Sequence, residues 1–353
     1  MIYVNNTHLI FFENRGCLSS VLTRKIKIHM KVKAGYTRKK IGKSFKYFDT
    51  SGSEVSDKKI LERIMKLVIP PNWKDVWIAK SATSDLQAFG FDQKERKQYI
   101  YHTKFVDQRQ AAKFSNILFM GKYLQELRKI STKHLKHQVW DMDKLCAIAF
   151  KIMDSTLIRI GNKRYTLTNK SYGLSTLEKR HINIENNKIS LAYKGKKGVF
   201  QQKSWSNRQQ AKLLEELLKM KGKRIFQIDS ATCESTFCGA AFNQYLRENS
   251  TGQISCKSIR IWGASREAFY QLAQTKQAEA LNARKRQLNK VIKDVAEQLG
   301  NTKTVSQTYY IHPTIQRLFM EGRFPSIKSK LPLAKLEDKL YRFLLKHTNK
   351  AIV

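Results

Sequence analysis

Five residues of this sequence stand in an order that could carry out chemistry on a phosphodiester: Arg159, Lys196, Arg260, Asn301 and Tyr310. A pentacoordinate phosphorus carries negative charge on its non-bridging oxygens. Two guanidinium groups and a neutral hydrogen-bond donor can stabilise that charge without a metal ion. A lysine can protonate the leaving oxygen, and a tyrosine hydroxyl can act as a covalent nucleophile. These residue types therefore predict bond transfer at a phosphate.

Each of these residues also has an ordinary structural role when it is considered alone. Arg159 lies in an apolar run and could cover a packed helix with its aliphatic stem. Lys196 lies at the tip of an expected hairpin, where a lysine is usually solvated, and Asn301 follows a helix-ending glycine. Tyr309 precedes Tyr310, and either ring could belong to the core. Their joint occurrence in this order favours the catalytic interpretation.

The charge of the chain indicates a polyanionic partner. Its 353 residues include 67 Lys and Arg against 28 Asp and Glu, which gives a formal net charge of +39. Nucleic acid is the expected partner, because neutralised phosphates release counterions and so drive binding. A solvated basic surface is the plainer alternative. Hydrophobic residues make up 41% of the sequence, which is enough for a packed core and excludes a disordered basic tail.

Other classes of site find little support in the sequence. Cys233 and Cys238 have no second pair nearby, and His134 and His137 have no partner cysteines or carboxylates, so we expect no metal site. In segment 35–44, six residues separate the glycines where a P-loop has four, so we expect no nucleotide site and no cofactor. The 5 scattered cysteines do not form a disulfide framework and indicate a reducing compartment. No apolar run approaches the roughly 18 residues of a membrane span.

Composition and hydrophobic periodicity divide the chain into three regions. Residues 1–34 form a basic extension, which permits a transit peptide, although initiation at Met30 is the interpretation we favour. Residues 35–108 are expected to form a small strand-rich domain. Residues 109–353 are expected to form a larger, mainly helical domain.

Particular elements within these regions can also be predicted. Ser56 is a plausible N-cap for a helix in the first domain. The second domain should contain a hairpin over residues 181–198 and a long helix over residues 274–299 that Gly300 ends.

Four sequence blocks are distinctive: KYFDTSG, IPPNWKDVWI, LQAFGFDQKERKQYIYH and RIGN…SYGLSTL. Together with the five chemical residues, they resemble type IB DNA topoisomerases of the small poxvirus and bacterial kind over roughly residues 35–325. The resemblance implies an α+β fold, with a small strand-rich N-terminal domain and a mainly helical catalytic domain of the type IB topoisomerase/tyrosine recombinase fold.

The resemblance also implies an activity. Enzymes of this family nick one strand of double-stranded DNA through a 3′-phosphotyrosyl intermediate, let the free end swivel and reseal the strand, which relaxes supercoils. Because transesterification conserves the phosphodiester energy, it implies neither ATP nor a metal ion as cofactor. Family members act as monomers, and no membrane partner is implied.

Site roles follow from the resemblance residue by residue. Tyr310 would be the nucleophile, and Arg159 and Arg260 would clamp the scissile phosphate. Lys196 would be the general acid that protonates the 5′ oxygen. Asn301 would donate a hydrogen bond to a non-bridging oxygen.

Further implications concern DNA contact and location. Gln98, Tyr99 and Tyr101 match DNA-contacting residues on the N-terminal domain. Asn301 stands where many relatives have His and points to a bacterial-type member, and hence to a cytoplasmic, nucleoid-associated location.

The sequence departs from the family pattern at a few positions. Glu95 replaces a common Gly, Tyr309 replaces a small residue, Gln201 and its neighbour follow the hairpin where a His is common, and residues 261–264 replace the usual Thr-Trp start. These positions affect turn shape and packing. Two alternatives stay open: a tyrosine recombinase, against which the IPPNWKDVWI and LQAFGFDQKERKQYIYH blocks argue, and a DNA-binding protein that has kept the fold without activity.

Overall fold

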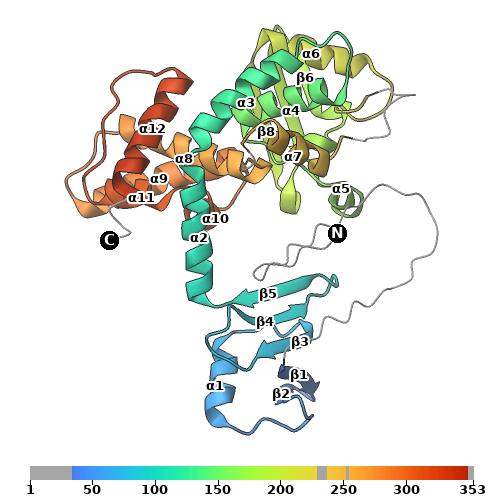
Figure 1. Cartoon of the computed structure of the whole chain (residues 1–353), viewed down its shortest axis with the longest axis vertical. Coiled ribbons are helices and arrows are strands. Elements are labelled where there is room, and N and C mark those ends of the chain that lie inside the picture. The colour runs from blue at the N-terminus through green and yellow to red at the C-terminus, as the bar shows by residue number, and fades with distance from the viewer. Residues whose placement is uncertain (1–33, 229–236, 252–253, 349–353) are drawn as a thin grey trace, which may run out of the picture. The chain divides into compact units, whose positions relative to one another are not determined.

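The computed structural model describes residues 34–228, 237–251 and 254–348 (Figure 1). The chain falls into two compact units, divided between Val106 and Asp107. Cys233 and residues 1–33 of the expected extension lie outside the described residues. Within the described part, no helix combines the length and the apolar composition needed to cross a membrane.

The first unit is built on an antiparallel sheet of 5 strands in the order β2-β1-β3-β4-β5 (Figure 1). Its core places Tyr36, Val76, Ile78 and Ala88 of the sheet against Ile64 of the helix. The sequence pattern did not predict β1, because its basic residues hide the alternation of a half-buried strand. The elements are β1 (Gly35–Ile41), β2 (Ser44–Phe48), α1 (Lys58–Lys66), β3 (Lys74–Ala79), β4 (Leu86–Phe91) and β5 (Lys97–Tyr101).

The helix of the first unit begins one residue later than the sequence suggested. Asp57, and not Ser56, is the N-cap of α1, and its carboxylate accepts a hydrogen bond from the Lys59 amide at 2.8 Å. The expected Ser56 cap is therefore wrong. A carboxylate at this position both satisfies a free amide and complements the positive end of the helix.

The turn between β4 and β5 explains why a glycine is common at the position that Glu95 occupies here. This residue has a φ of 55°, in the left-handed region that glycine adopts at least cost. Asp92 holds the turn, since its Oδ1 accepts hydrogen bonds from the amides of Lys94 at 2.9 Å and Arg96 at 3.0 Å. Hydrogen bonds from Arg96 in particular lower the Asp92 pKa to about 2, so the carboxylate stays ionised.

The second unit is mainly helical, begins within α2, whose first residues (103–106) belong to the first unit, and contains an antiparallel sheet of 3 strands in the order β6-β7-β8. Trp262, at 0% exposure, is the largest side chain buried in its core. The predicted fold class is confirmed, with a strand-rich N-terminal part followed by a mainly helical part. The elements are α2 (Thr103–Ile117), α3 (Met120–His134), α4 (Met142–Thr156), α5 (Lys163–Asn169), β6 (Ile182–Glu185), β7 (Lys188–Lys194), β8 (Phe200–Ser206), α6 (Arg208–Lys219), α7 (Gly239–Glu248), α8 (Cys256–Gln274), α9 (Leu281–Leu299), α10 (Lys303–Tyr309), α11 (Pro313–Met320) and α12 (Leu333–Thr348).

The helix expected over residues 274–299 is shorter than predicted. Gln274 is the last residue of α8, and α9 begins only at Leu281. The side chain of Gln287 holds the intervening segment, because it accepts from the Ala278 amide at 3.2 Å and donates to the Lys276 carbonyl at 2.9 Å. These contacts satisfy backbone groups that a continuous helix would have satisfied itself.

A buried carboxylate fixes α12 to the helices around it. Glu337 is 1% exposed and accepts hydrogen bonds from Arg128 of α3 at 2.6 Å and from Trp262 and Arg266 of α8 at 3.0 and 2.9 Å. Burial alone would raise the Glu337 pKa, but Arg128 and Arg266 lower it below its usual value. An ionised, fully paired carboxylate thus ties three helices together.

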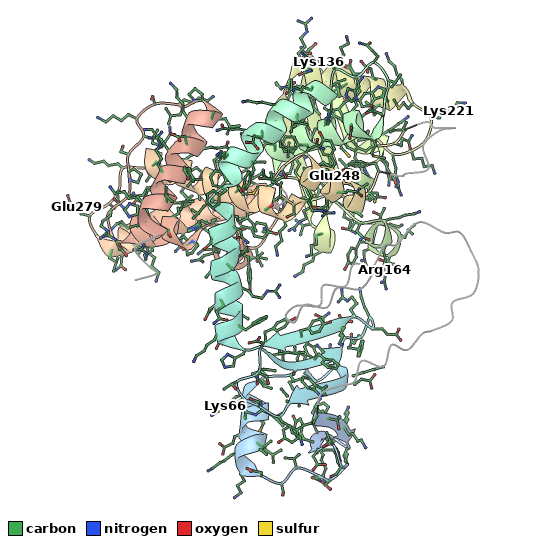
Figure 2. All side chains as sticks on the ribbon, viewed as in Figure 1. Lys66, Lys136, Arg164, Lys221, Glu248 and Glu279 are labelled. Carbon is green, nitrogen blue, oxygen red and sulfur yellow. The ribbon has the colours of Figure 1, made fainter. Side chains whose placement is uncertain are left out.

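Charged side chains cover the outside of both units. In Figure 2, the labelled Lys66, Lys136, Arg164 and Lys221 point outward from their elements, and all four are exposed. With a net charge of +39, this surface attracts polyanions over distances set by salt screening.

Candidate active site

The C-terminal end of α9 organises the predicted site. Gly300 ends the helix with a left-handed backbone at a φ of 61°, and the Asn301 amide turns back to the Ala296 carbonyl at 2.9 Å. This bond is typical of a Schellman motif. The last carbonyls of the helix, which include those of Leu299 and Gly300, remain free for side chains from other elements.

Arg159 reaches this helix end from the turn that follows α4. Leu157 ends α4 with a φ of 54°, which redirects the chain toward α9. Nη2 of Arg159 then donates to the Gly300 carbonyl at 3.2 Å and to Oδ1 of Asn301. Arg159 therefore contacts both the helix end and the residue that follows it.

The SYGLSTL block locks the backbone that carries Arg159. The Arg159 carbonyl accepts a hydrogen bond from the Leu174 amide at 2.8 Å. Gly161 has a φ of 87°, and Gly173 packs against it so closely that a Cβ on Gly173 would lie 2.6 Å from the Arg159 carbonyl oxygen. Glycine is required at both positions, which explains why the RIGN and SYG segments occur together.

Arg260 is brought to the same helix end by α8. Its side chain is 4% exposed, with Nε donating to the Leu157 carbonyl and Nη2 to the Leu299 carbonyl, each at 2.7 Å. Burial, and then the charge of Arg159, lower the Arg260 pKa to about 10, which still leaves the group protonated at neutral pH.

Tyr310 lies directly beside Arg260. It follows α10, is 8% exposed, and its Oη accepts a hydrogen bond from Nη1 of Arg260 at 3.4 Å. Ser265 of α8 fixes the backbone here, because its hydroxyl donates to the Tyr310 carbonyl at 3.1 Å and accepts from the His312 amide at 3.0 Å. The neighbouring Tyr309 is 43% exposed.

The charges around Tyr310 make its hydroxyl more acidic. Burial would raise the Tyr310 pKa, but Arg260, Arg159 and Lys257 outweigh burial and lower it below its usual value. A phenol whose anion is stabilised by cations is a better nucleophile near neutral pH.

Asn301 carries an unused hydrogen-bond donor. Its Oδ1 accepts from Arg159, which orients the amide, and its Nδ2 is buried without a hydrogen-bond partner among the described residues. A buried donor without a partner costs free energy unless something else satisfies it. Its position next to the two guanidinium groups suits it to donate to an anion.

Lys196 lies on the wall of a small cavity beside this cluster. The cavity is also lined by Arg159, Lys203 and Gly300. Lys196 is exposed at the start of the short turn between β7 and β8, where the Gly195 amide donates to the Val199 carbonyl at 2.8 Å. Within the residues that the structure describes, no group of three His, Cys, Asp or Glu side chains could hold a metal ion.

Comparison with known proteins identifies the family. The family model for the catalytic core of eukaryotic DNA topoisomerase I matches residues 96–323, and that for the N-terminal domain of bacterial DNA topoisomerase IB matches residues 44–92. DNA topoisomerase 1B of Acanthamoeba polyphaga mimivirus is 30% identical over 286 residues, which cover 78% of this chain and 85% of the relative. The chain belongs to the type IB DNA topoisomerase family.

Poxvirus relatives extend this result. DNA topoisomerase I of Monkeypox virus and DNA topoisomerase 1B of Vaccinia virus (strain Copenhagen) are each 24% identical over 279 residues, covering 78% of this chain and 86% of each relative. The predicted family, and with it a DNA-acting isomerase, is confirmed.

The structure of this topoisomerase joins four of the five predicted catalytic residues by hydrogen bonds and places the fifth, Lys196, nearby. Hydrogen bonds join Arg159 to Asn301 and Arg260 to Tyr310, and the α9 end joins the two pairs. Lys196 shares a cavity with Arg159. Their catalytic roles remain predictions.

The predicted DNA-contacting residues lie on β5 of the first unit. The rings of Tyr99 and Tyr101 stack with centroids 5.9 Å apart and are 47% and 38% exposed. Nε2 of Gln98 donates to Oδ2 of Asp92 at 3.0 Å, which ties it to the β4–β5 turn. Exposed stacked rings suit contact with a nucleic acid, and that contact stays a prediction.

Two lysines near the site were missed by the sequence reasoning. Lys257 lies three residues before Arg260 on the same helical face, a spacing that could have indicated it. Lys203 lies on β8 two residues after Gln201 and two before Trp205, so it faces the same side as both. A lysine on the inward stripe of a strand is the signal that could have found it.

Proposed function

We propose that this topoisomerase relaxes double-stranded DNA by transferring one strand to Tyr310. The observation that carries the proposal is the 3.4 Å hydrogen bond between Tyr310 Oη and Arg260, in a cluster that includes Arg159 and Asn301. Attack of Oη on phosphorus forms an Oη–P bond and breaks the P–O5′ bond. The product is a 3′-phosphotyrosyl link and a free 5′-hydroxyl end.

Three groups stabilise the charge that develops on phosphorus. Arg159 and Arg260 are held at the α9 end before DNA arrives, so they need little reorganisation during the reaction. Asn301 Nδ2, a buried donor without a partner among the described residues, donates to a non-bridging oxygen. These contacts strengthen as negative charge accumulates in the transition state.

Proton transfer completes the cleavage step. The Tyr310 hydroxyl releases its proton to solvent, which the lowered pKa favours. Lys196, on the exposed turn beside the cavity, donates a proton to the departing O5′. The reverse sequence reseals the strand, with the 5′-hydroxyl as nucleophile and Tyr310 as leaving group. One phosphodiester replaces another in each step, so the reaction needs no ATP.

The strand-rich domain, residues 35–108, is proposed to hold DNA for the catalytic domain, residues 109–353. Gln98, Tyr99 and Tyr101 would contact the duplex from β5. The exposed stacked rings and the net charge of +39 support this role.

The proposal also covers assembly and location. We expect the enzyme to act as a monomer, because one chain supplies the whole catalytic set. Asn301 favours a bacterial-type member and a cytoplasmic, nucleoid-associated location, although the relatives named above are viral. Sedimentation of the purified protein tests the first expectation.

Metal-free plasmid relaxation tests the proposed function. The wild-type protein should relax positive and negative supercoils in EDTA without ATP, and it should form a covalent adduct on a nicked suicide substrate. Tyr310→Phe should abolish both activities, whereas Tyr309→Phe should retain them. A strict requirement for magnesium or ATP, or adduct formation that depends on Tyr309, would overturn the proposal.

A further inference from the structure

Three consecutive carbonyls at the end of α9 each accept a hydrogen bond from a different cation. The Gln298 carbonyl accepts from Nζ of Lys203 at 2.6 Å. The next two carbonyls, of Leu299 and Gly300, accept from Arg260 at 2.7 Å and from Arg159 at 3.2 Å. The two predicted phosphate-binding arginines and Lys203 thus share one helix end.

The backbone explains why these carbonyls are available. At the end of α9, the Gly300 amide donates to the Glu297 carbonyl at 3.0 Å and the Asn301 amide to the Ala296 carbonyl at 2.9 Å. The next carbonyls, of Gln298, Leu299 and Gly300, accept no hydrogen bond from a backbone amide of α9. They also carry the negative end of the helix dipole, which favours cations.

Lys203 comes to this position from the sheet. It pairs with Leu191 across β7–β8 and lies on the inward stripe, opposite a strand face that buries Ile189, Leu191 and Tyr193. Within the described residues, no carboxylate forms an ion pair with Lys203. Its half-buried ammonium therefore depends on the Gln298 carbonyl.

The surroundings of Lys203 disfavour its protonated form. Burial, followed by the charges of Arg260 and Arg159, lowers the Lys203 pKa to about 8. Lys196 and Tyr193 line the same cavity, and burial keeps Tyr193 protonated at neutral pH by raising its pKa. Burial and like charge disfavour the ammonium form of Lys203 in the folded protein, so loss of this charge is not expected to destabilise the fold.

We propose that Lys203 is a positioning residue for strand transfer: its ammonium group fixes the Gln298 carbonyl, and thereby the helix end that holds Arg159, Arg260 and Asn301 around the scissile phosphate. The inference rests on the proposed function. A displacement of this end by a fraction of an ångström would move both guanidinium groups and the Asn301 donor together, and catalysis is sensitive to such shifts.

Single-turnover cleavage of a suicide substrate by the full chain tests the inference. Lys203→Met keeps an unbranched side chain of similar size and removes the donor, and it should slow cleavage by about tenfold to a hundredfold. Its thermal midpoint should equal or exceed that of the wild type, because a half-buried charge is lost. Lys203→Arg keeps a donor and should retain most of the rate. Lys188→Met, an exposed lysine at the far end of the same hairpin, is the matched control and should cleave normally.

A substrate with a sulfur in place of the bridging O5′ separates positioning from proton donation. The thiolate leaves without a proton donor, so this substrate should restore cleavage by Lys196→Ala and leave Lys203→Met slow. Cleavage by Lys203→Met at the wild-type rate, a rate loss that parallels a lower thermal midpoint, or rescue of Lys203→Met by sulfur would each overturn the inference. Failure of the proposed function would look different, since Tyr310→Phe would then still form the adduct.

Discussion

At the scale of single residues, the site depends on groups whose hydrogen bonds are only half satisfied. Asn301 shows this most clearly, because Arg159 occupies its oxygen while its Nδ2 has no partner among the described residues. Tyr310, the proposed nucleophile, has a hydroxyl whose pKa is lowered below its usual value. The unsatisfied Asn301 donor costs stability in the free protein, and its hydrogen bond becomes favourable when a phosphate is present.

Substitutions of Asn301 should distinguish the effect of its hydrogen-bond donor from the effect of a charge placed at this position. Asn301→Ala removes the donor to the non-bridging oxygen and should slow single-turnover cleavage by about a hundredfold. Asn301→His restores a donor and should recover most of the rate. Asn301→Asp places a carboxylate against Arg159 and beside the phosphate, so it should be slower than Asn301→Ala. Equal rates for Asn301→Ala and the wild type would show that this donor is idle.

His312, two residues after the proposed nucleophile Tyr310, provides a test of pH dependence. It is 2% exposed and packs edge-on against Phe114, with ring centroids 5.0 Å apart. Burial, and then the charge of Lys113, lower its pKa from the usual 6.5 to about 4. The unfolded chain therefore binds a proton more readily than the folded one between these values. His312 favours folding fully above pH 6.5, and this contribution is lost as the pH falls toward 4.

The measurement is the free energy of unfolding in urea at pH 7 and at pH 5. The wild type should lose about 2 kcal/mol more than His312→Asn over this range. Asn cannot titrate, and its side-chain oxygen can still accept from the Thr314 amide, which His312 Nδ1 now caps. An identical loss in both proteins would mean that other groups cause the acid sensitivity.

At the scale of elements, the end of α9 is the feature on which the site is built. A helix normally leaves its last carbonyls to solvent, but here they accept from Arg159, Arg260 and Lys203. The position of the phosphate-binding groups is therefore set by how the helix stops. Gly300 makes this ending possible, with its φ of 61°.

Gly300→Ala should slow the reaction more than it destabilises the fold. The left-handed backbone disfavours Ala, and a Cβ would lie 2.3 Å from Oε1 of Gln201 on the neighbouring strand. Gly42→Ala is the matched control, because Gly42 has the same φ of 61° and no atom within 4 Å of its Cβ position. Each change should cost about 1 kcal/mol of unfolding free energy. Only Gly300→Ala should slow cleavage; equal effects on cleavage would remove the special role of this helix end.

The candidate site residues could be named from the sequence, and their catalytic roles stay predictions; the elements that hold them were predicted less well. Arg159, Arg260 and Tyr310 could be recognised from the sequence, because the evidence for them is their residue type and their spacing along the chain. The start of α9 was not, because the hydrogen bonds of Gln287 to the segment before the helix are tertiary in origin. Lys203 was overlooked because its neighbours in space, at the end of α9, are almost a hundred residues away in sequence.

At the scale of the whole molecule, the residues behind the net charge of +39 fall into two groups, surface charges that act on DNA binding and site arginines that act on the reaction. Most lysines, like Lys66, Lys136 and Lys221 in Figure 2, are exposed and can contribute only through long-range attraction or phosphate contacts. Arg159 and Arg260 are instead fixed by hydrogen bonds to backbone carbonyls, at 3.2 Å for Arg159 and 2.7 Å for Arg260. Salt should therefore act strongly on the first group and weakly on the second, since buried interactions are poorly screened.

A salt titration can observe this separation directly. Between 50 and 200 mM salt, DNA affinity should fall by about a thousandfold or more if the enzyme neutralises six or more phosphates. The single-turnover cleavage rate at saturating enzyme should change by no more than about twofold, because bound DNA already lies against the half-buried Arg159 and the buried Arg260. Multiple-turnover relaxation should first accelerate with salt, as release from each plasmid becomes faster, and then decline as binding fails. If the saturated cleavage rate instead fell in step with affinity, the surface charges would belong to the chemical step itself.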